Sequence, residues 1–247
     1  MLKEISEHRS IRKYTDKPIP KEVMDNVLNA AIRASNTGNM QVYSIIVTTD
    51  EKIKEELAPT HFNQPMVKNA PAILTFCADF NRFNKWCRQR VAEPGYDNFL
   101  SFLTGAIDAI IAAQNACIEA EHHGLGICYL GTAIYNADKI IDILNLPKGV
   151  VPITAVTMGY PAETPELTDR LPVEAVVHYE KYNDFTAEDI DEIYAEKENR
   201  EDSKQFVKEN DKETLAQVFT DVRYSKANNE HFSSVLLEVL KKQGFFE

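Results

Sequence analysis

The hydrophobic pattern alternates between helix-like and strand-like stretches over the first 160 residues. Apolar residues recur at helical spacing from Val23 to Ile32 after Pro20, and the polar run at residues 35–39 is expected to end that helix. Residues 43–49 and 72–78 are β-branched and apolar, which predicts two strands, the second one central. A short helix capped by Asp50 is expected between them.

The best-defined helix is predicted at residues 99–123. Its apolar positions cover most of the circumference: Leu103, Ile107, Ile110, Ile111, Cys117 and Ile118. A helix of this kind needs cover on several sides, from its own sheet and from a second subunit. Gly124 and Gly126 are expected to end it. A strand at 127–130, a helix at 136–144 and a strand at 150–158 follow, so the order of elements predicts a layered α+β or α/β domain.

The chain changes character after residue 160. Residues 161–180 are rich in proline and predict an irregular arm, and residues 180–213 hold 13 acidic and 6 basic side chains, which is typical of a solvated helix. A last amphipathic helix is predicted at 232–242. We therefore expect a core at 1–180 and a charged helical extension at 181–247 that packs on the core or on a partner subunit.

Composition narrows the function classes. The chain has 247 residues and a net charge of −11, which disfavours nucleic acid as a partner. The sequence has neither an apolar run long enough for a membrane span nor an apolar signal segment at its start. Cys77, Cys87, Cys117 and Cys128 form no C-x-x-C pair, so we expect reduced core thiols in a cytoplasmic protein without a metal site.

Three polar stretches could carry chemistry. The basic run from His8 to Tyr14 suits either an anion site for a phosphate-bearing cofactor or a solvated loop. Residues 35–41 could bind the edge of a heterocycle or form a plain turn. The glycines in residues 124–131 precede a strand and lack the G-x-G-x-x-G spacing, which disfavours a Rossmann domain.

Several strings together resemble the nitroreductase family of flavin enzymes, in particular its NAD(P)H-dependent, oxygen-insensitive nitroreductases and flavin reductases. They are HRSIRKYTDKPI, SNTGNMQ, FCADFNR, AQNACIEAEHHGLGICYLG and GYPAETPELTDRLP, and they extend to about residue 170. The resemblance implies a nitroreductase-like α+β sandwich with a mixed sheet and a long central helix. It also implies an interlocked homodimer that binds FMN at the subunit interface.

The resemblance also implies the cofactor-binding residues. The phosphate and the ring edge would be held by His8, Arg9, Ser10 and Arg12, with Arg170 completing the phosphate contacts. The two flanks of the ring would be lined by Gln64 and by the backbone of Tyr129, Leu130 and Gly131. The partner subunit would contribute Ser35, Asn36 and Asn39. This chain has Thr168, followed by Asp169, where the related proteins carry a lysine, so we expect weaker phosphate binding.

The implied activity is a ping-pong hydride transfer from NADPH or NADH through FMN to a small-molecule acceptor, namely a nitroaromatic, a quinone or free flavin. The flavin carries the chemistry, so no catalytic side chain is expected, and Arg12 would support the reduced ring. Three alternatives remain at this point. The protein could be a flavin-binding store or sensor with little turnover, or a scaffold that has lost the ligand. It could also be an enzyme of the same fold that acts on halogenated aromatics or on reduced flavin.

Overall fold

The computed structural model describes residues 1–246, and its centre is a four-stranded sheet in the order β1-β2-β4-β3. The strands are β1 (Tyr43–Thr48), β2 (Ala72–Asp79), β3 (Gly126–Leu130) and β4 (Val150–Gly159). Every residue of β2 and β4 is buried, and for β2 the apolar run at 72–78 predicted this. All neighbouring strands pair antiparallel, and the mixed character expected of the sheet is confined to a parallel bridge between Ser10 and Ile127.

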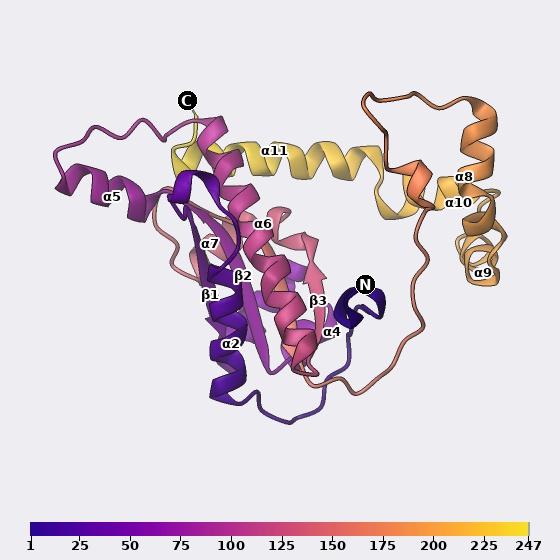
Figure 1. The fold of residues 1–247 in the computed structure, drawn as a ribbon, viewed down its shortest axis with the longest axis horizontal. Coiled ribbons are helices and arrows are strands. Elements are labelled where there is room, and N and C mark those ends of the chain that lie inside the picture. Colours follow the sequence, from indigo (N-terminus) through magenta and orange to yellow (C-terminus); the bar gives the residue numbers. More distant parts are fainter. Residues whose placement is uncertain (247) are drawn as a thin grey trace. The chain divides into compact units, whose positions relative to one another are not determined.

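Helices cover both faces of this sheet (Figure 1). One face carries α2 (Lys21–Ile32) and α6 (Phe99–His122), which pack on side chains such as Leu74 and Phe76. The opposite face packs Ile73 and Cys128 against a second set of elements. That set comprises α3 (Glu51–Leu57), η2 (Ala58–His61), α4 (Pro65–Asn69), η3 (Gly131–Ile134) and α7 (Ala137–Ile143). The result is the layered α+β arrangement that the element order predicted.

Local sequence explains where the principal helices begin. Asp50 caps α3 by accepting a hydrogen bond from the Ile53 amide, and Asn98 caps α6 in the same way through Ser101. α6 has the length and hydropathy of a membrane-spanning helix, but 56% of its most apolar window is buried inside the protein. A core helix of a layered domain has this composition, because one side of it lies against the sheet.

The chain divides into two compact units, and the division differs from the expected boundary at residue 180. One unit comprises Met1–Glu166 together with the chain from Phe232 onward, and the other is Leu167–His231. The first unit also contains α1 (Lys3–Ser6), η1 (Thr37–Asn39) and α5 (Asn81–Gln89), which the hydrophobic pattern did not predict. The last helix, α11 (Lys226–Gln243), begins six residues before the predicted position 232.

The second unit contains the charged stretch. Its elements are η4 (Val173–Ala175), α8 (Ala187–Asn199), α9 (Glu201–Glu209), α10 (Leu215–Gln217) and η5 (Val218–Arg223). Neither α8 nor α9 buries a residue, which confirms the expectation of solvated helices. In the first unit the four cysteines are buried and unpaired, as expected of reduced core thiols.

Candidate functional site

The basic segment near the N-terminus lies along the outer edge of β3. Ser10 forms the parallel bridge with Ile127, and the Ile11 amide donates to the Ile127 carbonyl at 2.8 Å. Ile11 is buried against Gly126, where an added Cβ would lie 2.5 Å from Ile11 Cγ1. Only glycine at 126 therefore permits this approach, and the segment behaves as a short additional strand.

A carboxylate holds the other end of the segment. Glu163 Oε1 accepts hydrogen bonds from the backbone amides of Arg12 and Lys13 at 2.7 and 3.0 Å. Tyr14 bridges to Pro161, and the Tyr14 hydroxyl donates to the Ile11 carbonyl. The backbone of residues 10–14 is thus fixed on both sides, and Arg12 in the middle of the segment is exposed.

His8 and Arg9 precede this fixed stretch. His8 Nδ1 lies 2.6 Å from Glu121 Oε1, and burial raises the pKa of Glu121 although this hydrogen bond opposes the rise. Arg9 donates from Nη1 to the Glu7 carbonyl at 2.9 Å, while its buried Nε has no partner among the described residues. A buried donor without an acceptor costs about 1–3 kcal/mol, so this position suits an anion.

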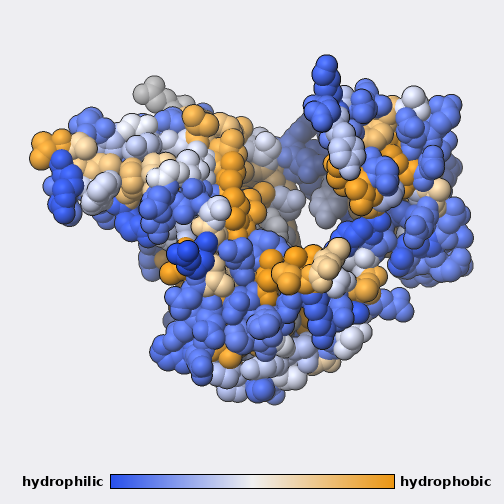
Figure 2. Space-filling view, in the orientation of Figure 1, coloured by the Kyte–Doolittle hydropathy of each residue, from blue (hydrophilic) through white to orange (hydrophobic). Residues whose placement is uncertain are grey.

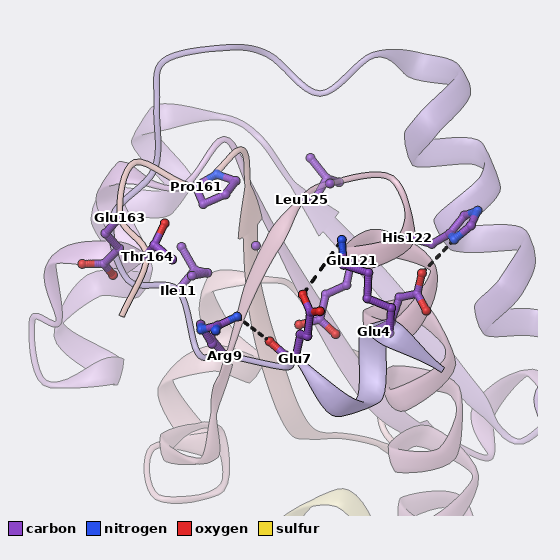
Figure 3. A pocket seen from close by; sticks show the side chains of 13 residues that line it. Glu4, Glu7, Arg9, Ile11, Glu121, His122, Leu125, Pro161, Glu163 and Thr164 are labelled. Atoms are coloured by element: carbon purple, nitrogen blue, oxygen red, sulfur yellow. Dashed lines mark hydrogen bonds and ion pairs between the residues drawn. The ribbon is translucent and has the colours of Figure 1, made fainter. Parts of the chain in front are cut away.

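A pocket of about 460 Å³ lies beside Arg9 (Figure 3). Four carboxylates line it, together with Arg9 and Lys3: Glu4, Glu7, Glu121 and Glu163. Figure 3 shows Arg9 turned toward Glu7, with Glu4 and His122 joined on the far side. Of the predicted cofactor residues only Arg9 lines this pocket, so the pocket by itself does not gather the predicted site.

The end of β3 supplies the predicted backbone flank. Leu130 is buried, so its side chain is directed into the core. Tyr129 donates from its hydroxyl to Gln114 Oε1 at 3.3 Å, and burial raises its pKa. An added Cβ on Gly131 would meet no atom within 4 Å, so the surface above this turn is open. The backbone at Gly131 is therefore accessible from that side, and its contact with a ligand stays a prediction.

Gln64 is connected to the same turn through His61, a residue that the sequence analysis missed. Gln64 Nε2 donates to the His61 carbonyl at 3.1 Å, and His61 Nδ1 lies 2.7 Å from Thr132 Oγ1. Burial lowers the pKa of His61 to about 4, so its ring is neutral at physiological pH. The structure thus brings Gln64 together with the turn that follows β3.

Ser35, Asn36 and Asn39 lie at the opposite edge of the sheet, around η1 just before β1. Three strand spacings of about 4.8 Å separate the β1 edge from β3, which places about 14 Å between these edges. Asp108 of α6 fixes this turn, because its Oδ1 accepts from the Thr37 amide and hydroxyl at 3.0 and 3.2 Å. Asp108 therefore connects α6 to the turn before β1.

Arg170 belongs to the second unit, so its approach to the N-terminal segment stays a prediction. Its guanidinium donates to Thr168 Oγ1 at 2.7 Å and to the Asp169 carbonyl at 2.8 Å. Lys197 lies 2.7 Å from the Asp169 carboxylate and lowers its pKa. A cation from α8 thus accompanies Asp169, next to Thr168, the position where the resemblance implied a lysine.

Comparison with known proteins decides the family. The family model described as "Nitroreductase family" matches residues 5–160, which is more than half of the chain. The chain belongs to the nitroreductase family. This confirms the resemblance carried by the motifs and accounts for the shared α+β fold.

Individual nitroreductases and flavin reductases are similar over most of their length. An FMN reductase [NAD(P)H] from Bacillus subtilis is 36% identical over 190 residues, or 74% of each chain. An oxygen-insensitive NADPH nitroreductase from Salmonella typhimurium is 38% identical over 175 residues, or 71% of each chain. The crystal structure of an oxidoreductase from Bacteroides fragilis is 54% identical, with a TM-score of 0.98 and all of both chains covered.

Proposed function

We propose that this nitroreductase is an FMN-dependent NAD(P)H oxidoreductase that passes electrons to nitroaromatics, quinones or free flavin. The names of the relatives from B. subtilis and S. typhimurium support the activity. The observation in the structure that best supports a phosphate-bearing cofactor is the buried Nε of Arg9, a donor without a partner among the described residues. Bound FMN would accept a hydride from NADPH or NADH and pass electrons to the acceptor in a ping-pong sequence.

The residues of the chain would bind and orient the cofactor without acting as acids or nucleophiles. One subunit would contribute His8, Arg9, Ser10, Arg12, Gln64, Tyr129, Leu130, Gly131 and Arg170. The fixed backbone of residues 10–14 supports this assignment, because it holds the backbone of Arg12 beside β3, within reach of which its guanidinium extends. There its positive charge would stabilise negative charge on the reduced ring.

We also propose that two copies form a homodimer in the cytoplasm. The outer side of α6 exposes six large apolar side chains by 37–71%: Phe99, Leu100, Leu103, Ile107, Ile110 and Ile111. Figure 2 shows a band of apolar side chains over the upper part of α6. An apolar band of this kind marks an association surface. Asp108 ties η1 to the same helix, so the partner subunit's Ser35, the partner subunit's Asn36 and the partner subunit's Asn39 could complete the site.

The visible absorption spectrum of the purified protein tests this function directly. We expect a yellow protein whose flavin band is bleached by NADPH or NADH without oxygen and restored by a nitroaromatic or a quinone. A colourless protein that does not take up added FMN would refute the proposal. A yellow protein that neither nucleotide bleaches would instead indicate a flavin store or sensor.

Two substitutions test the phosphate assignment. Arg9→Lys keeps the positive charge but removes Nε, and Arg170→Ala removes the arginine of the second unit. A charge-assisted hydrogen bond contributes about 1.5–3 kcal/mol, so each variant should bind FMN about 10- to 100-fold more weakly. Arg88→Ala, on the exposed side of α5, is the control. Unchanged FMN affinity in both variants would refute the assignment.

A further inference from the structure

The end of η2 is a buried turn held by several hydrogen bonds. His61 is 1% exposed, and the preceding Thr60 donates from its hydroxyl to the Leu57 carbonyl at 2.7 Å. The Thr60 carbonyl accepts a hydrogen bond from Asn136 Nδ2 at 2.8 Å. Asn136 immediately precedes α7, so this turn is anchored to an element far away in the sequence. His61 is therefore held at a fixed place in the layer.

His61 contacts the two loops that carry proposed cofactor residues. Its carbonyl accepts hydrogen bonds from both the backbone amide and the side-chain amide of Gln64, at 3.2 and 3.1 Å. Its ring nitrogen Nδ1 lies 2.7 Å from Thr132 Oγ1. Thr132 directly follows Gly131, so one residue connects Gln64 with the turn after β3.

The backbone between His61 and Gln64 reverses sharply. Phe62 and Asn63 both have left-handed conformations, with φ of 55° and 54°. A bulky residue is rarely found in this region, and such a conformation costs on the order of 1 kcal/mol or more. The Phe62 ring lies 6.4 Å from the ring of Tyr135, which follows η3. The two loops thus meet through a second contact.

We propose that His61 is a positioning residue that sets the distance between Gln64 and the Gly131 backbone, so that both meet the same heterocyclic ring. The inference rests on the proposed FMN-dependent function and extends it to two residues, His61 and Thr132. Because Nε2 of Gln64 is engaged by the His61 carbonyl, its Oε1 and second N–H remain as an acceptor beside a donor. The pyrimidine edge of a flavin carries N–H and carbonyl groups that complement this pair.

The contact between His61 and Thr132 can be removed with little change of volume. Thr132→Val deletes the hydroxyl and Thr132→Ser keeps it. Thr75→Val in the middle of β2 is the control for the same exchange at a threonine that does not contact His61. Loss of one neutral hydrogen bond that orients a ligand residue should weaken FMN binding about 3- to 10-fold in Thr132→Val. The flavin absorption band should also shift in this variant, whereas Thr132→Ser should behave nearly as the wild type.

Hydrogen exchange in the FMN-free protein tests the contact without the cofactor. Peptides covering residues 58–66 should exchange faster in Thr132→Val than in the wild type, and Thr75→Val should leave this region unchanged. If Thr132→Val matches the wild type in FMN affinity, absorption band and exchange, the positioning role is refuted while the proposed function stands. If the wild type itself does not bind FMN, the proposed function and the inference both fail.

Discussion

The two faces of the sheet are packed in different ways. The face under α6 meets small side chains, because Ala109, Ala112, Ala113 and Ala116 are all buried against it. The opposite face, under η2, α4 and α7, contains buried polar residues as well as apolar ones, including Lys54, Thr60, His61 and Asn136. Close apolar contact therefore dominates the face under α6, where Asp108 adds hydrogen bonds to η1, and hydrogen bonds of several buried polar residues supplement apolar contact on the other.

This difference in packing suits the two faces of the sheet to different roles. Small residues let α6 approach the sheet closely, and they leave its large apolar side chains on the outer side, where a second subunit could cover them. On the opposite face, hydrogen bonds fix turns that have little apolar surface of their own, such as the turn that carries Gln64. This difference supports the proposals that one face serves association and that the other holds the ligand-facing loops.

The largest effect is expected on the outer side of α6. Ile110→Glu would place a charge in the proposed dimer interface, once from each subunit. Burial of an unpaired carboxylate should cost about 4 kcal/mol or more, which raises the dissociation constant of the dimer roughly a thousandfold. Analytical ultracentrifugation should detect monomers that have lost FMN. A wild-type protein that sediments as a monomer with FMN bound would contradict the assignment of this face.

The next largest effect concerns His61, on the sheet face under η2, α4 and α7, and the dependence of stability on pH. Burial lowers the pKa of His61 from 6.5 to about 4. The unfolded chain therefore binds more protons between these values, so this contribution is complete above pH 6.5 and is lost as the pH falls toward 4. This difference in pKa corresponds to about 3 kcal/mol in the free energy of unfolding. Urea unfolding between pH 4 and 7 should follow this curve, and an NMR titration showing His61 protonated near pH 6.5 would contradict it.

Local features and long-range contacts were not equally predictable from the sequence. The helix at 99–123, the strand at 72–78 and the cap at Asp50 were recoverable, because apolar periodicity and capping are local signals. The roles of His61 and Thr132 were not, since residues 71 positions apart meet only after β3 and η2 are packed. The short α5 was missed because Phe83, Trp86 and Cys87 are its only apolar residues; they have helical spacing, but the stretch is too short and polar to stand out.

The same distinction between local signals and long-range contacts applies to the candidate site. Motif resemblance supplied the residue types, and the structure brings His8, Arg9, Ser10 and Arg12 to the β3 edge as one segment. No local pattern indicates that Glu163 would hold that segment through backbone amides from 151 positions away. The cation beside Asp169 was equally hidden, because Lys197 reaches it from a separate helix.

A core substitution compares the packed side of α6 with its outer side. Ala109→Leu adds volume where the side chain is fully buried against the sheet. Overpacking of this kind should lower the free energy of unfolding by about 2 kcal/mol. Ile111→Leu, on the outer side of the same helix, is the matched control and should change it by less than about 0.5 kcal/mol. Equal effects in urea unfolding would show that the two sides are packed alike.

The smallest effect is expected from removing a single hydrogen bond on the sheet face under η2, α4 and α7. Asn136→Ala removes the hydrogen bond to the Thr60 carbonyl and should lower the free energy of unfolding by about 1 kcal/mol. Lys139→Ala is the control, since Lys139 reaches the amide oxygen of Asn136 from an exposed position. Because this hydrogen bond anchors the turn that ends at His61, Asn136→Ala should also speed hydrogen exchange at residues 58–66. Lower stability without faster exchange there would show that Asn136 supports the fold generally and does not fix this turn.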